Sequence, residues 1–246
     1  PHLTTVQGDL DAALATILRL DAIQSTVAGR TDSGVHATGQ VAHVDVDDSV
    51  NPERLLRQLN SILKAGAIHV HGVVRAPEGF DARYSPLFRR YEYRISDGLA
   101  NRDPRTRRFT YWIDDHLDID LMNQAASSIL GLHDWTTYCK PRPGATRVRE
   151  LQIFRWHREN DGTLVAEIQA DAFCHNMVRN LVGMCIAVGR GRLTVADAVG
   201  LRDERTRTSA FIVIPAHGLT LVEVGYPADA EVGERAELSR ARREPV

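Results

Sequence analysis

Two β-rich runs, 147–157 and 164–171, constrain the fold more than any other feature, because a tight-turn sequence joins them. The joining segment contains Asn160, Asp161 and Gly162, and an Asp-Gly pair readily adopts the positive φ angles of a two-stranded turn. We therefore predict an antiparallel hairpin, and with it an antiparallel sheet rather than a parallel one.

Apolar spacing around this hairpin predicts further elements. They are strands at 88–96 and 107–113, helices at 119–130, 175–188 and 195–201, and a strand at 218–226. The main order is strand, helix, strand, strand, helix, strand, which is the ferredoxin-like plan.

The first part of the chain predicts the same plan without its opening strand. It has a helix over roughly 6–18, strands at 24–29 and 39–46, a helix at 52–63 ended by Gly66, and a strand at 67–75. We predict an α+β fold of two ferredoxin-like (βαββαβ) halves, with an antiparallel sheet, helices on one face and a central active-site cleft. The halves are expected at 1–83 and 84–227, and the charged tail 228–246 is expected to be mobile or a solvated helix.

Composition excludes a membrane protein and gives little sign of a disulfide scaffold. No apolar run approaches the roughly 20 residues that span a bilayer, and the first residues lack a signal peptide's pattern. Cys139, Cys174 and Cys185 are odd in number and form no C-x-x-C pair. We expect small buried residues in a reducing compartment, no zinc site, and a cytoplasmic protein without a membrane partner.

The positive charge is almost entirely arginine, since Lys64 and Lys140 are the only lysines. A GC-rich genome explains such a bias, but arginine also grips phosphate and stacks on bases. One window interleaves arginines with Tyr84, Tyr91, Tyr93 and Phe109, a pattern that suits a nucleic-acid backbone with exposed bases. Its arginines are Arg83, Arg89, Arg90, Arg94, Arg102, Arg105, Arg107 and Arg108.

The loop 28-AGRTDSGVHATGQVAHVDVDD-48 concentrates chemistry around Asp32. Thr-Asp-Ser-Gly is also an ordinary turn sequence, so a turn role for Asp32 is one interpretation. The other is a catalytic carboxylate, because Arg30 is two residues away and Gly34 and Gly39 let a ligand approach the backbone. A metal set of His36, His43 and Asp45 is a third, although its spacing matches no standard ligand pattern.

Two further segments carry candidate residues. In 171-DAFCHNMVRNLVG-183, Arg179 lies off the apolar helical face, and it is either a surface arginine or a partner for a carboxylate or phosphate. In 89-RRYEYRI-95, Tyr91 and Tyr93 share one strand face, so each is either core packing or part of a site.

Together these blocks resemble the tRNA pseudouridine synthase A family. AGRTDSGVHATGQVAH is similar to its active-site motif, FDARYSPLFRRYEYRI to its tyrosine segment, AFCHNMVRNLVG to its arginine helix, and PAHGLTLVEVGYP, with Leu219, to its closing strand. The family's opening strand has no counterpart here, so we suspect a missing N-terminal strand.

The resemblance implies a homodimer that isomerises uridine to pseudouridine in the anticodon arm of tRNA, at positions 38, 39 and 40, without metal or organic cofactor. It implies Asp32, Tyr91 and Arg179 as catalytic residues, with Tyr91 stacking on a flipped base. It also implies RNA contacts at Arg30, His36, Arg83, Arg89, Arg90 and Leu219. The alternatives are a ferredoxin-like RNA-binding module without chemistry and a metal-dependent hydrolase.

Overall fold

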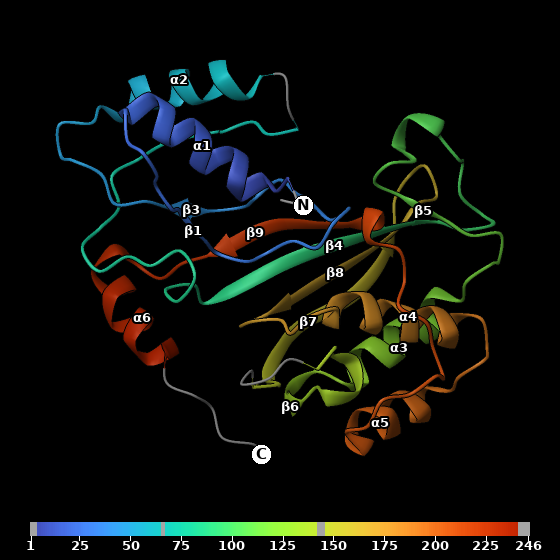
Figure 1. Cartoon of the computed structure of the whole chain (residues 1–246). Helices are drawn as coiled ribbons and strands as arrows, with labels where there is room; N and C mark the ends of the chain where they lie inside the picture. Colours follow the sequence, from blue (N-terminus) through green and yellow to red (C-terminus); the bar gives the residue numbers. More distant parts are fainter. Residues whose placement is uncertain (1–3, 65–66, 142–145, 241–246) are drawn as a thin grey trace. The chain divides into compact units, whose positions relative to one another are not determined.

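The structure is a computed structural model that describes residues 4–64, 67–141 and 146–240 (Figure 1). Its residue contacts divide the chain into two compact units. Unit 1 holds the residues up to Arg30 together with Val41–Ser85 and Pro227–Arg240, and unit 2 holds Thr31–Gln40 and Pro86–Tyr226. The loop that carries Asp32 therefore belongs to unit 2, whereas the division expected from the sequence places it in the N-terminal half, 1–83.

Unit 1 is built on two packed helices, α1 and α2. Thr5 caps the first by accepting from the Gly8 amide, and Asn51 caps the second by accepting from the Arg54 amide. Its elements are α1 (Val6–Leu18), β1 (Thr26–Val27), β3 (Ala42–His43), α2 (Pro52–Leu63), the 3-10 turn η4 (Asp229–Glu231) and α6 (Val232–Arg240). The apolar faces of α1 and α2 form its core, made of Ala13, Leu14, Leu55, Leu59 and Leu63.

The strand predicted at 67–75 is wrong, because these residues form no regular strand. Ile68, Val70 and Val73 pack against the unit 1 core instead. The side-chain amide of Asn60 donates to the Val70 carbonyl and accepts from the Val70 N–H, both at 2.8 Å. One side chain thus satisfies the backbone groups that a neighbouring strand would otherwise pair. Gly66, the predicted helix stop, lies outside the described residues.

The charged tail folds as helix α6 over its described part. Val232 and Ala236 are buried, and the Ser85 hydroxyl donates to the Val232 carbonyl at 2.9 Å. Arg240 pairs with Asp81 at 3.0 Å. One face of this helix is therefore packed rather than solvated.

Unit 2 is a sheet covered by helices. Its elements are β2 (His36–Ala37), β4 (Phe88–Ser96), η1 (Pro104–Thr106), β5 (Tyr111–Trp112), α3 (Ile119–Ser128), β6 (Gly131–Asp134), η2 (Thr136–Tyr138), β7 (Val148–Arg158), β8 (Leu164–Ala170), α4 (Met177–Gly189), α5 (Val195–Glu204), η3 (Ala216–Gly218) and β9 (Leu219–Gly225). The strands run in the order β2-β9-β4-β8-β7-β6, with β5 beside β4. The pairs β9–β4, β4–β8, β8–β7 and β7–β6 are antiparallel.

The predicted hairpin is confirmed as β7 and β8, with Gly162 at φ +86° in its turn. The strand expected at 107–113 shrinks to the two residues of β5, because Asp103 and Pro104 start a 3-10 turn just before it. Strands β2 and β6 were not predicted. Both are short, and β6 begins at Gly131, whose φ of +110° turns the chain out of α3.

Helices α3 and α4 lie side by side over one face of the sheet (Figure 1). Helix α4 is buried along most of its length, including Met177, Leu181 and Met184. Gly183 is required there, because a Cβ at this position would lie 2.1 Å from the Ile212 carbonyl oxygen. This close approach fixes α4 against the segment that leads into β9.

The fold is thus α+β with a mostly antiparallel sheet. No helix in the described part of the chain is long and apolar enough to cross a membrane.

Candidate active site

The loop 31–40 is held on the edge of the unit 2 sheet by β2. His36 and Ala37 pair in parallel with Thr220 and Leu221 of β9, and the amides of Thr38 and Gly39 donate to the Leu221 carbonyl at 2.9 and 3.1 Å. These contacts fix the loop within a few residues of Asp32.

Asp32 lies in a turn and is also part of a charged cluster. Its carbonyl accepts from the Val35 amide at 3.0 Å, and Gly34 follows at φ +83°, so the turn interpretation holds for the backbone. Its side chain, 42% exposed, projects toward an imidazole and a guanidinium. Oδ1 lies 3.6 Å from His175 Nε2, and Oδ2 lies 3.9 Å from Arg179 Nη1.

Arg179 is a half-buried residue of α4 rather than a free surface arginine. Its side chain is 19% exposed. Its Nε donates to the Ile214 carbonyl at 2.6 Å, and its Nη1 donates to Asn176 Oδ1 at 3.2 Å. These two bonds hold the guanidinium beside Asp32.

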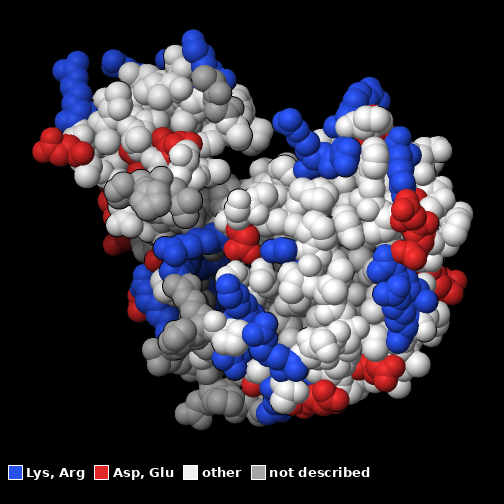
Figure 2. All heavy atoms as spheres, turned by 45° about the vertical axis from the view of Figure 1, so that its right-hand side comes forward, with Lys and Arg blue, Asp and Glu red and all other residues white. Residues whose placement is uncertain are grey.

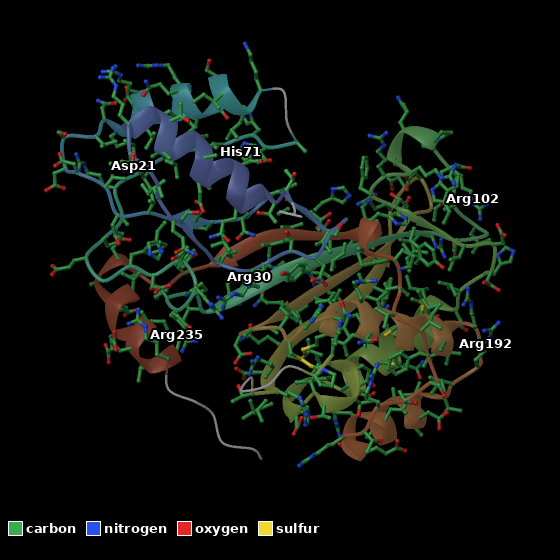
Figure 3. The ribbon with its side chains drawn as sticks, viewed as in Figure 1. Asp21, Arg30, His71, Arg102, Arg192 and Arg235 are labelled. Carbon is green, nitrogen blue, oxygen red and sulfur yellow. A yellow bond between two sulfur atoms is a disulfide. The ribbon has the colours of Figure 1, made fainter. Side chains whose placement is uncertain are left out.

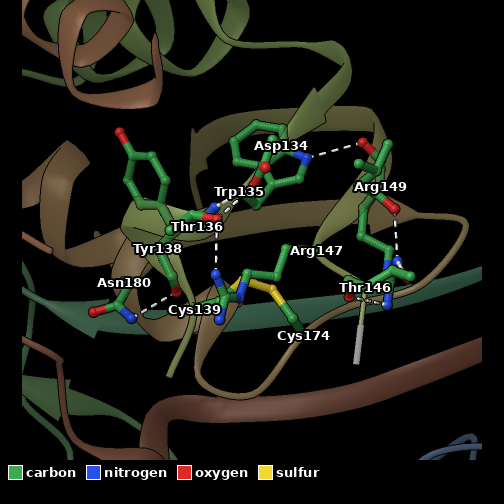
Figure 4. The surroundings of a disulfide bond; sticks show 11 residues. Asp134, Trp135, Thr136, Tyr138, Cys139, Thr146, Arg147, Arg149, Cys174 and Asn180 are labelled. Atoms are coloured by element: carbon green, nitrogen blue, oxygen red, sulfur yellow. Dashed lines mark hydrogen bonds between the residues drawn. A yellow bond between two sulfur atoms is a disulfide. The ribbon is translucent and has the colours of Figure 1, made fainter. Parts of the chain in front are cut away.

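His175 precedes α4 in a segment tied down at several points. Its carbonyl accepts from the Lys140 amide at 2.9 Å. The following residue, Asn176, has φ +65°, a left-handed conformation that turns the chain into the helix. The preceding residue, Cys174, is bonded to Cys139 (Figure 4).

The disulfide between Cys139 and Cys174 corrects the expectation of three unpaired cysteines. The two Cα atoms are 5.7 Å apart, within the range that a disulfide spans. The folded chain brings together residues 35 positions apart, which no spacing rule reveals. Cys185 remains a buried free thiol, as expected, and burial raises its pKa to about 12.

Tyr91 lies on β4, where only 9% of its surface is exposed. Its ring packs edge-on against Phe173, with centroids 5.2 Å apart. The pKa of its phenol is raised to about 12, chiefly by burial, with Arg89 lowering it and the Asp32 carboxylate raising it by smaller amounts. The phenol is therefore protonated at neutral pH and lies within the electrostatic reach of Asp32.

Tyr93 and Leu219 belong to the core beside this cluster. Tyr93 is fully buried and donates to the Pro215 carbonyl at 2.8 Å. Leu219 is 5% exposed and pairs with Tyr93 across β4 and β9. A Cβ on Gly218 would lie 2.7 Å from the Tyr93 ring, so glycine is needed at that corner.

The arginines of β4 alternate between the two faces of the sheet. Arg89 shares the face of Tyr91 and donates to the Asp171 carbonyl at 2.8 Å. Arg90 points to the other face, where it bonds Gln169 and pairs with Glu223 at 2.8 Å. Arg90 is therefore not brought together with Asp32.

The remaining arginines of the window are spread over different partners. Arg94 pairs with Glu159, Arg102 with Asp114, and Arg105 with Asp103. Arg102 and Arg107 both stack on Trp112. Their guanidinium carbons lie 5.6 and 5.4 Å from the centroid of its ring. In Figure 2 the basic side chains of unit 2 form several groups, with acidic side chains among them.

Two predicted RNA contacts lie in unit 1. Arg30 is an exposed residue (Figure 3). Arg83 follows in the segment before β4, where its backbone amide donates to Asp81 and its guanidinium lies 5.3 Å from the Tyr84 ring centroid.

The two histidines of the alternative metal set have structural contacts. His36 Nε2 lies 2.8 Å from the Arg108 carbonyl oxygen, and its ring packs against Phe109. His43 Nδ1 accepts from the Ala82 amide at 2.9 Å. Among the described residues, no group of three or more His, Cys, Asp and Glu side chains is arranged to hold a metal ion.

The sequence places His175 on one helical stripe with Arg179 but does not identify it as a site residue, and it gives no role to Phe173. Both stand in the stretch AFCHNMVRN, within six residues of Arg179. The usable signal was the chemistry of that stretch, an aromatic and an imidazole just before the helix that carries the arginine.

Known proteins resemble the chain over nearly its whole length. A family model described as tRNA pseudouridine synthase matches residues 125–227. A tRNA pseudouridine synthase A from Leifsonia xyli subsp. xyli is 52% identical over 261 residues, covering 99% of this chain and 91% of that protein. The one from Frankia casuarinae is 48% identical over 245 residues, covering 100% and 89%. The one from Mycobacterium leprae is 43% identical over 251 residues, covering 96% and 86%.

Proposed function

The chain belongs to the tRNA pseudouridine synthase A family, and from this premise we propose that Asp32 is the catalytic carboxylate of the site described above. The protein is an enzyme that isomerises uridine to pseudouridine in tRNA. The alternative of an RNA-binding module without chemistry is not favoured by this kinship.

The observation that carries the proposal is the placement of the Asp32 side chain between His175 and Arg179, within the electrostatic reach of the Tyr91 phenol. The reaction breaks the bond from uracil N1 to ribose C1′ and forms one from C5 to C1′, with no change in oxidation state. An ionised carboxylate serves it by attacking C1′, by adding to C6, or by stabilising charge while a C2′ proton leaves.

Tyr91 is proposed to receive the target base. A uridine stacked in an RNA stem must be extruded before its glycosidic bond is accessible, at a cost of a few kcal/mol. Stacking of an extruded base on an aromatic ring recovers about 1–3 kcal/mol. The phenol of Tyr91 is also the group proposed to move the C5 proton, since its neighbour Asp32 acts on the same nucleotide.

The substrate is proposed to be the anticodon arm, with uridines 38, 39 and 40 as targets. Arg30, Arg83 and Arg89 are proposed to bind its phosphates, and His36 and Leu219 to shape the site. Arg90, which is paired with Glu223, is proposed to contact RNA only after that pair opens. The stacked guanidinium groups of Arg102 and Arg107 add planar donors suited to phosphate.

The finer architecture is also part of the proposal. The strand order β9-β4-β8-β7 and helices α3 and α4 support a ferredoxin-like plan for 84–227, and a second ferredoxin-like half at 1–83 is part of our proposal. We propose further that the enzyme is a cytoplasmic homodimer that uses neither metal nor organic cofactor. Light scattering of the purified protein tests the dimer, and activity in excess chelator tests the metal.

Replacing Asp32 tests the central assignment. Asp32→Ala is expected to raise the barrier by at least about 5 kcal/mol, or roughly four decades in rate, because the reacting carboxylate is gone. The measurement is single-turnover pseudouridine formation on unmodified tRNA, with mapping of each anticodon-arm uridine.

Asp45→Ala is the matched control, because Asp45 is an exposed carboxylate that we place outside the site. It is expected to keep wild-type activity, with or without chelator. Pseudouridine formation by Asp32→Ala at a rate near wild type contradicts the proposal, and tRNA binding by that variant shows that the fold is kept.

A further inference from the structure

We propose that His175 is a positioning residue that fixes the orientation of the Asp32 carboxylate. The proposal rests on the catalytic role assigned to Asp32. It adds a second group to the one that the sequence motif predicts, and it assigns each of the two groups to one carboxylate oxygen.

One nitrogen-bearing side chain lies near each oxygen of the Asp32 carboxylate. His175 Nε2 lies 3.6 Å from Oδ1, and Arg179 Nη1 lies 3.9 Å from Oδ2, so the imidazole is the nearer of the two. An aspartate side chain rotates easily about its last bond, whose torsional preference is broad. One contact leaves that rotation open, whereas contacts on both oxygens fix the plane of the carboxylate.

Arg179 has limited capacity to do this alone. Its Nε is bonded to the Ile214 carbonyl, and its Nη1 also donates to Asn176. These bonds hold the guanidinium to α4 and to the segment before η3, which limits how far it can follow Asp32. A second group beside the other carboxylate oxygen restricts the rotation that Arg179 alone leaves open.

His175 is well placed to act as that second group because its backbone is fixed. The Lys140 amide donates to its carbonyl, and the disulfide from Cys174 to Cys139 ties the preceding residue to the end of η2. The Met177 amide donates to the Cys174 carbonyl at 3.0 Å, which starts α4. The imidazole itself is 41% exposed, so substrate can approach the pair from solvent.

Three variants test this role. His175→Leu removes the imidazole while keeping a side chain of similar bulk. His175→Gln keeps an N–H donor at the corresponding atom. His157→Leu is the matched control, because His157 is an exposed histidine of β7 that we place outside the site. The steady-state kcat and KM of each variant are measured on unmodified tRNA, together with its thermal unfolding midpoint.

His175→Leu is expected to lower kcat about tenfold, because Oδ1 of Asp32 loses the polar group that lies 3.6 Å from it, with KM unchanged. His175→Gln is expected to recover most of that loss, and His157→Leu to match the wild type. A wild-type kcat in His175→Leu overturns the proposal. So does an equal loss in His175→Leu and His175→Gln when both unfold at the wild-type midpoint.

A double variant tests whether the two groups act on the same carboxylate. His175→Leu combined with Arg179→Ala is expected to lose less activity than the product of the two single losses, because groups that act as a unit are not additive. Independent, multiplicative losses contradict the shared target. If Asp32→Ala retains activity, the catalytic assignment fails, whereas an inactive Asp32→Ala with an unaffected His175→Leu rejects only the role of His175.

Discussion

Tyr91 and Tyr93 stand two residues apart on the same face of β4, yet their surroundings separate their roles. The ring of Tyr93 packs directly against Gly218, and its hydroxyl donates a hydrogen bond to the Pro215 carbonyl. Tyr91 packs on Phe173 and is affected by the Asp32 charge. The sequence identifies both as one strand face, and only the neighbours contributed by distant segments distinguish core from site.

The phenol of Tyr91 is expected to contribute beyond stacking. Tyr91→Phe keeps the ring but removes the hydroxyl, and we expect kcat to fall about 100-fold, the usual scale of acid–base catalysis. Its pKa is raised to about 12, so the ionised form grows with pH throughout the measurable range. The wild-type kcat should therefore rise between about pH 7 and pH 9.5, and Tyr91→Phe should lose that rise.

Tyr91→Leu is the companion variant, because it removes the ring as well. It is expected to weaken binding of the flipped base by a further 1–3 kcal/mol, the order of one base–aromatic stack. A near-normal kcat in Tyr91→Phe assigns stacking alone to this residue.

Two residues of the candidate site can be identified from the sequence alone, because their motifs carry distinctive chemistry. Asp32 and Arg179 come from separate motifs, and in the fold Asp32 Oδ2 lies 3.9 Å from Arg179 Nη1. The sequence does not identify His175 as a site residue, because the helical stripe that it shares with Arg179 does not show what either side chain faces. Its meaning depends on a contact across more than half the chain, which local patterns do not encode.

At the scale of elements, the Asp32 loop depends on a very close backbone approach at Gly39. A Cβ on this residue would lie 2.1 Å from the Val222 carbonyl oxygen and 2.9 Å from the Glu223 nitrogen. The two-residue strand β2 exists only because the loop can lie this near β9. Such a short parallel pair leaves no periodic pattern in the sequence.

Gly39→Ala is expected to disturb activity far more than stability. The added methyl group must push the loop away from β9, and a shift of about 1 Å at a catalytic group costs on the order of 100-fold in rate. The measurement is kcat together with the urea midpoint of unfolding.

Gly200→Ala is its control, because a Cβ at this position of α5 meets nothing within 4 Å. It is expected to leave kcat unchanged and to raise stability by up to about 1 kcal/mol, since alanine favours helix. A fully active Gly39→Ala shows that the loop tolerates displacement.

Long elements were predicted well, and short or irregular ones were not. Strands β4, β7 and β8 have strong β-rich runs, α2 and α3 have apolar faces and side-chain caps, and α4 has a long apolar face. The segment 67–75 also carries alternating apolar residues, but side-chain bonds from Asn60 replace a strand partner. Apolar periodicity shows which side of a segment is buried. It does not show which groups form hydrogen bonds with the backbone N–H and C=O of that segment.

At the scale of the whole molecule, one buried ion pair closes unit 2 at the end of its longest strands. The Asp97 side chain is fully buried, and both its oxygens accept from Arg158 at 2.8 and 2.9 Å. The amides of Leu99 and Leu117 also donate to it. Burial alone would raise the pKa of Asp97, but these bonds lower it below its ordinary value.

Asp97→Asn is expected to destabilise the protein by about 2–3 kcal/mol at pH 7, because it leaves Arg158 half-buried without its counter-charge. Since the folded-state pKa of Asp97 is lowered, its stabilisation is present above the unfolded value of ~3.9 and is lost as the pH falls through the folded value. The difference between the variant and the wild type should therefore shrink in acid. Urea unfolding at several pH values measures it.

Asp48→Asn is the exposed counterpart, since Asp48 is fully exposed and its partner Arg75 has 61% of its side chain exposed. An exposed pair contributes at most about 1 kcal/mol, so this variant should remain close to the wild type at every pH. If both variants lose the same free energy of unfolding, the buried pair of Asp97 and Arg158 contributes no more than an exposed pair, and the prediction is wrong.

The pairing of β2 with β9 also sets an order of events during synthesis. The Asp32 loop is translated early, whereas Leu221, whose carbonyl holds the amides of Thr38 and Gly39, is translated near the end of the described chain. Contacts between such distant residues form late, because a long loop must close first. A chain still on the ribosome therefore carries its proposed catalytic aspartate unanchored, and the enzyme becomes competent only after β9 has emerged.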